Sequence, residues 1–211
     1  IPVKPIINLL KGQKRILQES ARHPLKLLVL GGGPAGVEIA GNLWALRENI
    51  GKKGDITLVA GSRLLKNMPS RVRELAYAIL RRRGIEILEG VHASKVSDGE
   101  ALLSDGHRVG FDFAFAATGV TPSPLFKDSG LPTGPDGGLL VNSFLQSPAY
   151  PEMFGGGDCI HFQDRPLAKV GVYAVRENPI LYQNLFNALA NLPPTPFHPQ
   201  KDYLLILNMG G

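Results

Sequence analysis

A glycine-rich turn between two apolar segments constrains this chain more than any other feature of its sequence. The stretch from Leu25 to Leu43 is LKLLVLGGGPAGVEIAGNL. Its nearly all-apolar run 26–30 is typical of a parallel strand that is buried on both faces. From Val37 onward, apolar residues recur at helical spacing. We therefore expect a strand, a tight turn and a helix, which is how a dinucleotide-binding fold begins.

Three glycines in this turn, Gly31, Gly33 and Gly36, fit the pattern G-x-G-x-x-G. Gly31 permits the tight turn, Gly33 lets the backbone approach a pyrophosphate, and Gly36 lets the helix pack on the strand. The free amides and the dipole at the start of the helix favour a negative group. Between a strand and a helix the motif predicts bound NAD or NADP; the alternative is a glycine-rich turn without a ligand.

The next strand, expected over residues 55–59, has no carboxylate at its far end, where a dinucleotide fold holds the ribose hydroxyls. Asp55 lies about 20 residues beyond the glycines, which is the usual spacing of the ribose-binding carboxylate. However, it begins the strand, so at about 3.3 Å per residue it lies more than about 10 Å from the nucleotide. Ser62 and Arg63 follow the strand and could contact a 2′-phosphate, whereas a solvated loop is the alternative for Arg63. The sequence therefore does not decide between NAD and NADP as the bound nucleotide.

The following segments complete an α/β fold with a parallel nucleotide-binding sheet. A helix with Ser70 as its N-cap precedes the strand IEILEG at 85–90. Asp105-Gly106 is a hairpin turn signal, which predicts a small antiparallel meander crossing over to a last strand at 113–117. Thr118-Gly119 then end that strand beside the glycine turn.

Composition excludes several classes of function. The 211 residues include one cysteine, Cys159, so there is no disulfide framework, no C-x-x-C pair and no cysteine-rich zinc site, and a small buried thiol is expected. The five histidines show no metal spacing. The net charge of +5 is modest, and its densest patch, 81–83, fits a helix C-terminus better than a nucleic-acid surface. We expect a cytoplasmic protein, with peripheral membrane attachment of the full-length protein as the alternative.

Three segments in this order resemble a known family: VLGGGPAGVEIA, then FAFAATGVTPSP, then GGLLVNSFLQSPAYPEMFGGGDCIHF. Together they are similar to the pyridine nucleotide-disulfide oxidoreductase superfamily, whose members are flavoproteins with two dinucleotide-binding domains. The resemblance covers almost all of residues 25–190. It implies a Rossmann-like NAD(P)-binding domain plus part of a FAD-binding domain.

The resemblance also implies roles for individual residues. The turn residues would line the NAD(P) pyrophosphate, and these are Gly31, Gly33, Pro34, Ala35 and Gly36. Glu38 matches a glutamate near the point where nicotinamide reaches the flavin, and a carboxylate favoured by the helix dipole is the alternative. Thr118 and Gly119 would abut the nucleotide through their backbone. Asp158, with Gly156 and Gly157 beside it, would hold the ribityl chain of FAD.

The tail of the chain is similar to type II NADH dehydrogenase relatives, especially those associated with selenide, water dikinase. This implies hydride transfer from NAD(P)H to FAD and onward to an acceptor that the residues leave open, a quinone or a small molecule. A non-catalytic NAD(P)H-binding or interaction module is the first alternative. A sulfide:quinone oxidoreductase-like enzyme is the second, although such enzymes depend on several cysteines. No catalytic residue and no metal ligand is assigned.

Three segments are expected: a connector at 1–24, the NAD(P)-binding domain at 25–121, and a return segment of the FAD-binding domain at 122–211. No second glycine-rich turn is present, and an apolar strand-like run begins near Tyr203. We expect this chain alone not to hold FAD tightly. A strand with Met153 and Phe154, and a helix over 172–192, would expose apolar surface, which predicts self-association.

Overall fold

The computed structural model describes residues 1–211, which form two compact units. Unit 1 consists of residues 1–119 together with 206–211, and unit 2 consists of residues 120–205. Both ends of the chain thus pack with unit 1, so the structure groups residues 1–24 and 206–211 with the predicted nucleotide-binding segment. The roles assigned to the three predicted segments stay predictions.

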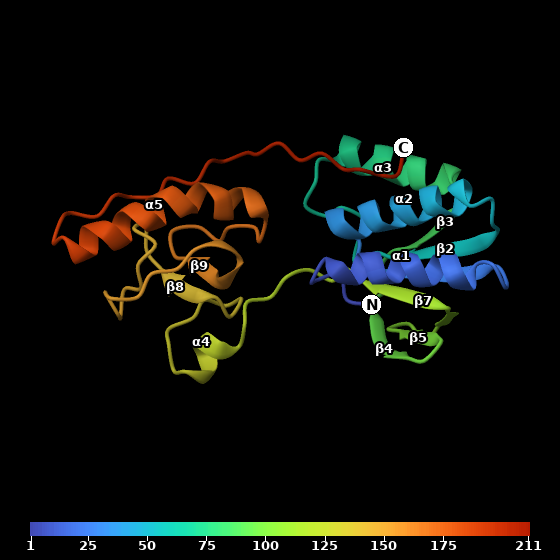
Figure 1. The fold of residues 1–211 in the computed structure, drawn as a ribbon, viewed down its shortest axis with the longest axis horizontal. Helices are drawn as coiled ribbons and strands as arrows, with labels where there is room; N and C mark the ends of the chain where they lie inside the picture. Colours follow the sequence, from blue (N-terminus) through green and yellow to red (C-terminus); the bar gives the residue numbers. More distant parts are fainter. The chain divides into compact units, whose positions relative to one another are not determined.

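Unit 1 is built on a four-stranded parallel sheet with the strand order β3-β2-β1-β7 (Figure 1). Helices α2 and α3 connect its first three strands along the chain. The bounds are β1 Leu25–Leu30, α2 Pro34–Asn49, β2 Gly54–Val59, α3 Ser70–Arg82, β3 Ile85–Leu88 and β7 Phe113–Ala116. The predicted α/β class with a parallel nucleotide-binding sheet is confirmed.

Each face of this sheet is covered by a different layer, which explains its apolar strands. In β1, Leu27 and Val29 join the core cluster that the helices cover, whereas Leu28 and Leu30 join a second cluster with residues of the meander. Side chains alternate across a strand, so a strand that is covered on both faces has to be apolar throughout. The continuous apolar run 27–30 is the sequence signature of this burial, whereas Lys26 before it is exposed.

The second layer is the predicted antiparallel meander, formed by β4 Ala93–Ser97, β5 Glu100–Leu103 and β6 Arg108–Gly110. Asp105 and Gly106 lie in the turn between β5 and β6, as predicted. Gly106 has a φ of +89°, and the Asp105 carboxylate accepts the His107 N–H at 3.0 Å. One local prediction is wrong: α3 begins at Ser70 itself, Pro69 occupies the N-cap position, and no side chain caps the helix.

The two ends of the chain complete unit 1. Helix α1, Ile7–Glu19, packs through its buried Ile16 against the core under the helices. At the other end, Leu207 and Met209 pack on that same core. The strand predicted to begin near Tyr203 is not formed. The main chain of residues 208 and 209 instead bonds to side chains of unit 1.

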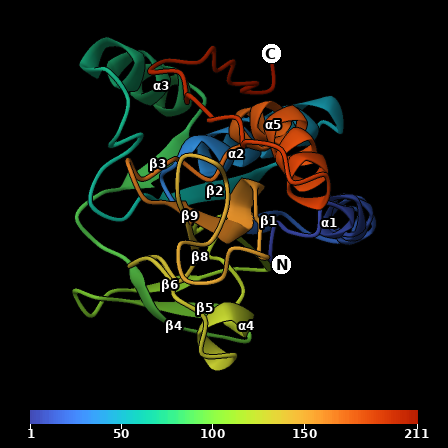
Figure 2. The same cartoon turned by 90° about the vertical axis from the view of Figure 1, so that its left-hand side faces the viewer.

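Unit 2 contains a two-stranded parallel sheet covered by a long helix (Figure 2). Its elements are α4 Leu125–Asp128, β8 Leu139–Val141, the 3-10 helix η1 Gly157–Cys159, β9 Ile160–Phe162 and α5 Gly171–Leu189. The predicted strand with Met153 and Phe154 is wrong, since the loop there closes on itself. Phe154 makes only an isolated bridge to Gln146, and Gly155 N–H donates to the Leu145 carbonyl at 3.0 Å.

Helix α5 has an unusual distribution of side chains, with polar groups on its buried face and apolar groups outside. The buried polar residues are Glu177, Asn184 and Asn187. The exposed apolar stripe consists of Val175, Tyr182, Phe186 and Leu189, the last of which is 87% exposed. None of the helices combines the length with the apolar character that crossing a bilayer requires.

Candidate functional site

The glycine turn lies at the carboxyl end of β1, where the chain passes directly into α2. Gly31 has a φ of +124°, and its N–H donates to the Val59 carbonyl at 2.8 Å. A Cβ added at Gly31 would collide with the Ala117 carbonyl, and one at Gly36 would collide with the Gly31 carbonyl. Both positions are therefore closed to any side chain. This agrees with the tight turn and the close helix packing assigned to them.

Gly33 differs from its neighbours because a Cβ added there would meet nothing within 4 Å. Its φ of −78° and ψ of −179° are also open to other residues. Gly33 is the N-cap of α2, Pro34 occupies the first helical turn, and no side chain caps the helix. Because no side chain caps the helix, the first-turn amides, including that of the exposed Ala35, have no capping partner, and an anion is favoured at such a helix start. The geometry fits a pyrophosphate at this position.

A pocket of about 200 Å³ opens beside the turn, and we call it the turn pocket. Its lining includes Gly33, Pro34, Ala60, Ser62, Arg63 and Lys66. Two hydrogen bonds hold the loop that follows β2. Leu65 N–H donates to the Gly32 carbonyl at 2.7 Å, and Leu64 N–H donates to the Glu89 carboxylate at 2.6 Å. Sequence reasoning identified Ser62 and Arg63 but missed Lys66, which a search for cations further along the loop would have found. No carboxylate lines the turn pocket.

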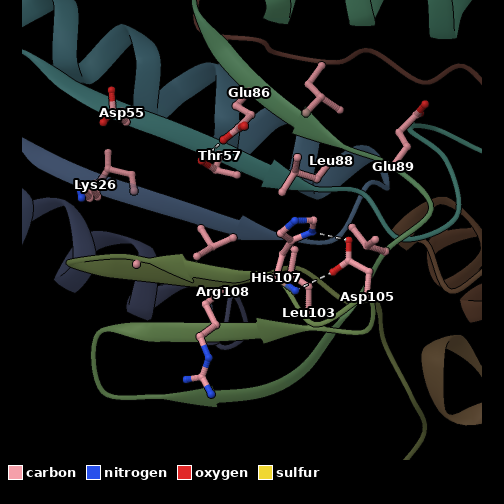
Figure 3. A pocket seen from close by; sticks show the side chains of 15 residues that line it. Lys26, Asp55, Thr57, Glu86, Leu88, Glu89, Leu103, Asp105, His107 and Arg108 are labelled. Carbon is pink, nitrogen blue, oxygen red and sulfur yellow. Dashed lines mark hydrogen bonds and ion pairs between the residues drawn. The ribbon is translucent and has the colours of Figure 1, made fainter.

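Asp55 lies elsewhere, as its position in the strand predicted. It lines a separate pocket of about 710 Å³ between the parallel sheet and the meander (Figure 3). There the Glu86 carboxylate accepts the Thr57 hydroxyl at 3.0 Å, and Asp105 pairs with His107 at 2.9 Å. Asp55 is therefore no candidate for holding a ribose at the glycine turn.

Thr118 and Gly119 follow β7 beside the turn, as predicted. Ala117 N–H donates to the Leu30 carbonyl at 2.7 Å, which places the end of β7 next to the end of β1. The Thr118 nitrogen lies 3.2 Å from the position of a Cβ on Gly31. Thr118 and Gly119 are both exposed, so their backbone is open to a ligand. Their contact with a nucleotide stays a prediction.

Glu38 has a partner that neither interpretation of its sequence position anticipated. Its carboxylate accepts the Asn208 N–H at 2.8 Å, and the Asn208 carbonyl accepts from the Asn42 side chain at 3.0 Å. We call residues 206–211 the C-terminal strap. Glu38 also lies beyond the first turn of α2, which contains no acidic residue. Because the two partners lie 170 positions apart, the sequence carries no signal for this contact.

In unit 2 the predicted flavin residues lie in the 3-10 turn that leads into β9. Gly157 has a φ of +72°, and the turn continues through a half-buried Asp158. Cys159 is also half-buried rather than buried as expected, because its thiol is placed at the turn and donates to the Gly156 carbonyl at 3.0 Å. A left-handed glycine before a carboxylate fits a close approach to a polar ligand.

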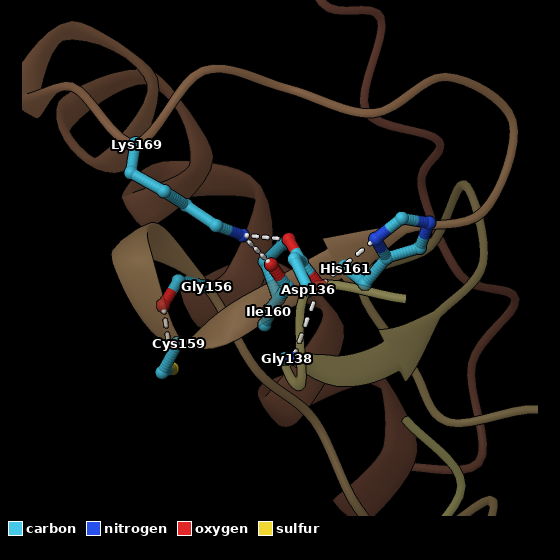
Figure 4. Close-up of polar contacts among 7 residues, drawn as sticks. All are labelled: Asp136, Gly138, Gly156, Cys159, Ile160, His161 and Lys169. Atoms are coloured by element: carbon cyan, nitrogen blue, oxygen red, sulfur yellow. Dashed lines mark hydrogen bonds and ion pairs between the residues drawn. The ribbon is translucent and has the colours of Figure 1, made fainter. Parts of the chain in front are cut away.

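Charged side chains that sequence reasoning missed brace this turn (Figure 4). The Asp136 carboxylate accepts from Lys169 at 2.9 Å and pairs with His161 at 3.0 Å, and Lys169 also donates to the Ile160 carbonyl. Burial tends to raise the pKa of Asp136, but the hydrogen bonds from Lys169 and Gly138 outweigh it and hold that pKa below its ordinary value. No group of three His, Cys, Asp or Glu side chains could hold a metal ion.

Comparison with known proteins gives this geometry a family context. The family model for the pyridine nucleotide-disulphide oxidoreductases matches residues 7–183. The chain is similar to internal alternative NAD(P)H-ubiquinone oxidoreductase A1 of Arabidopsis thaliana, with 27% identity across 88% of this chain and 39% of that protein. It is also similar to ferroptosis suppressor protein 1 of Taeniopygia guttata, with 29% identity across 88% of this chain and 51% of that protein. The chain thus spans about half the length of these relatives, or less.

Solved structures show the same fold. The sulfide:quinone oxidoreductase of Aquifex aeolicus superposes with a TM-score of 0.80 over 99% of this chain and 54% of that chain, at 17% identity. A ferredoxin reductase of Rhodopseudomonas palustris superposes with a TM-score of 0.65 over 88% of this chain and 45% of that chain, at 20% identity. At such identities the likeness establishes architecture alone.

Proposed function

The chain belongs to the pyridine nucleotide-disulphide oxidoreductase family, and from this premise we propose that it forms the NAD(P)H-binding part of a FAD-dependent oxidoreductase. In this proposal the protein passes hydride from nicotinamide to flavin and then electrons to a quinone or another small acceptor. The observation that carries it is the glycine turn, where Gly31 and Gly36 are closed by packing while Gly33 faces open space at an uncapped helix N-terminus.

The names of two relatives support a quinone as the acceptor. One is the Arabidopsis NAD(P)H-ubiquinone oxidoreductase, and another is demethylphylloquinone reductase NdbB of Synechocystis sp., which is 26% identical across 71% of this chain and 37% of that protein. A sulfide-oxidising role has less support. The similarity to the sulfide:quinone oxidoreductase is one of fold alone. The single cysteine, Cys159, donates its thiol hydrogen to the Gly156 carbonyl in its own turn.

The chain's own residues contribute binding and placement. The amides at the start of α2 would take the pyrophosphate of NAD(P)H, and the exposed backbone of Thr118 and Gly119 would flank it. Asp158 would hold FAD, with Gly157 allowing the close approach. When bound, FAD supplies the redox chemistry, and the protein supplies orientation and electrostatics.

The turn pocket further supports acceptance of NADPH as well as NADH. A carboxylate at this position would repel a 2′-phosphate, and the pocket has none. Arg63 and Lys66 supply two cations and Ser62 a hydroxyl, all three exposed. Arginine in particular can bind a phosphate with two parallel hydrogen bonds.

The test uses the full-length polypeptide that contains this chain. We expect a visible flavin absorption band that NADH and NADPH bleach without oxygen, and that a soluble ubiquinone analogue restores. A flavin band that neither nucleotide bleaches would overturn hydride transfer and favour the non-catalytic module. Bleaching without recovery by the quinone analogue would overturn only the acceptor.

A further inference from the structure

Glu177 is the one acidic or basic side chain among the buried residues of this chain. It lies on the inner face of α5 and is 2% exposed. A buried carboxylate is costly unless hydrogen bonds or charges compensate for its lost hydration. The hydrogen-bond donors and charges around Glu177 therefore indicate what role the carboxylate has.

The main compensation comes from the turn before Asp158. The Gly157 N–H donates to the Glu177 carboxylate, at a residue whose φ of +72° needs a glycine. The preceding Gly156 packs closely on the same helix. A Cβ added there would lie 3.2 Å from Leu181 Cδ2 and 3.4 Å from the Glu177 carboxylate. The turn is thus seated directly on α5, with Glu177 as its polar attachment.

Two further charges act on Glu177, one from the loop before α5 and one from the turn that contains Gly157. The Lys169 cation attracts it, although Lys169 also bonds the Asp136 carboxylate and the Ile160 carbonyl (Figure 4). Asp158, in the turn itself, repels it. Burial raises the pKa of Glu177 above its ordinary value, the Gly157 N–H and Lys169 oppose this rise, and Asp158 adds to it.

Packing alone does not explain a carboxylate at this position. The other buried polar residues of α5 are neutral amides that fasten loops, such as Asn184, whose side chain bonds the carbonyls of Phe144 and Thr195 at 2.8 Å each. Glu177 instead holds the residue next to Asp158. We propose that Glu177 is a positioning residue: as a hydrogen-bond acceptor it fixes the Gly156-Gly157 turn, so that Asp158 is presented to the flavin. This inference rests on the proposed function.

The contact itself can be tested without flavin, by following the Gly157 amide by NMR in the 211-residue chain across a pH titration. Its proton resonance should move downfield as Glu177 ionises, with a midpoint above the ordinary value of 4.5. Glu177→Gln should abolish this titration. A Gly157 resonance that is independent of pH in the parent chain would overturn the proposal.

The cofactor role is tested in the full-length polypeptide by FAD titration of three variants. Glu177→Leu removes the acceptor and should weaken FAD binding about tenfold, because the turn that presents Asp158 is no longer held in place. Glu177→Gln keeps an acceptor oxygen and should bind within about threefold of the parent protein. Asn184→Leu, on the same buried face but away from the turn, should lower stability and leave FAD affinity unchanged.

The outcomes separate the two claims. Equal FAD affinity of Glu177→Leu and the parent protein, or equal losses in Glu177→Leu and Asn184→Leu, would overturn the positioning role. If the parent protein holds no flavin while Gly157 still titrates with Glu177, the proposed function fails, and the assignment of this turn to a flavin is overturned with it.

Discussion

At the scale of single residues, the glycines of the turn have different physical reasons to be glycine. Gly36 has no room for a methyl group, since its Cα faces the Gly31 carbonyl. Gly33 has room, and its backbone angles suit any residue. The first is therefore required by the fold, whereas the predicted approach of a ligand would explain the second.

This difference predicts opposite phenotypes for two equally small substitutions. Gly36→Ala should lower the free energy of unfolding by about 3 kcal/mol, the upper end of typical overpacking costs. Gly33→Ala should change it by less than about 0.5 kcal/mol and weaken NADH and NADPH binding about tenfold. Denaturant unfolding and calorimetric titration measure the two effects. If Gly33→Ala bound both nucleotides like the parent chain, the turn would not be the pyrophosphate site.

Arg63 should distinguish the two nucleotides. Arg63→Ala removes a cation from the turn pocket, so we expect NADPH affinity to fall about tenfold while NADH affinity stays within about twofold. Arg82→Ala, an exposed arginine in the last turn of α3, is the matched control and should alter neither. Equal losses for both nucleotides would place Arg63 at a part of the ligand that they share.

At the scale of elements, the sequence predicted what periodicity and turn chemistry determine locally. The strand–turn–helix unit around Gly31 and the hairpin at Asp105-Gly106 formed as predicted, because short-range geometry decides them. The strand expected at Met153 and Phe154 did not form, since apolar character alone does not supply a strand partner. Glu38 with Asn208, and Glu177 with Gly157, join residues far apart in the chain, and no local pattern records such contacts.

The exposed apolar stripe of α5 predicts association between molecules. Because Tyr182, Phe186 and Leu189 are exposed together on one side of the helix, the 211-residue chain should sediment with a mass that rises with concentration. The double variant Phe186→Glu, Leu189→Glu should sediment as a monomer. Leu125→Glu, at an exposed leucine in α4, serves as the control and should behave like the parent chain. A parent chain that is monomeric at every concentration would contradict the prediction.

At the scale of the whole molecule, the C-terminal strap makes unit 1 depend on the last residues of the chain. Leu207 and Met209 pack on its core, Arg83 donates to the Met209 carbonyl, and a Cβ on Gly41 would collide with the Met209 backbone. The strap also occupies one oxygen of Glu38. The stability of unit 1 and the orientation of Glu38, a predicted cofactor residue, thus both depend on the C-terminal strap.

Deleting residues 206–211 should lower the free energy of unfolding of unit 1 by about 1–3 kcal/mol, in proportion to the apolar surface that is lost. Gly41→Val should reproduce this loss in the intact chain by displacing the strap. Leu204→Ser, at an exposed residue just before the strap, is the control and should have little effect. Denaturant unfolding measures all three, and a deletion as stable as the parent chain would show that the strap adds nothing to the fold.

Unit 1 is discontinuous in the chain, and this has a consequence during translation. Its first 119 residues leave the ribosome early, but residues 206–211 follow only after the whole of unit 2. At about 5–20 residues per second, the nascent nucleotide-binding unit waits several seconds before its last segment can dock on α2. During that interval Gly41 and the apolar side chains near it are uncovered. The nascent chain therefore exposes to chaperones a surface that the strap covers in the folded chain.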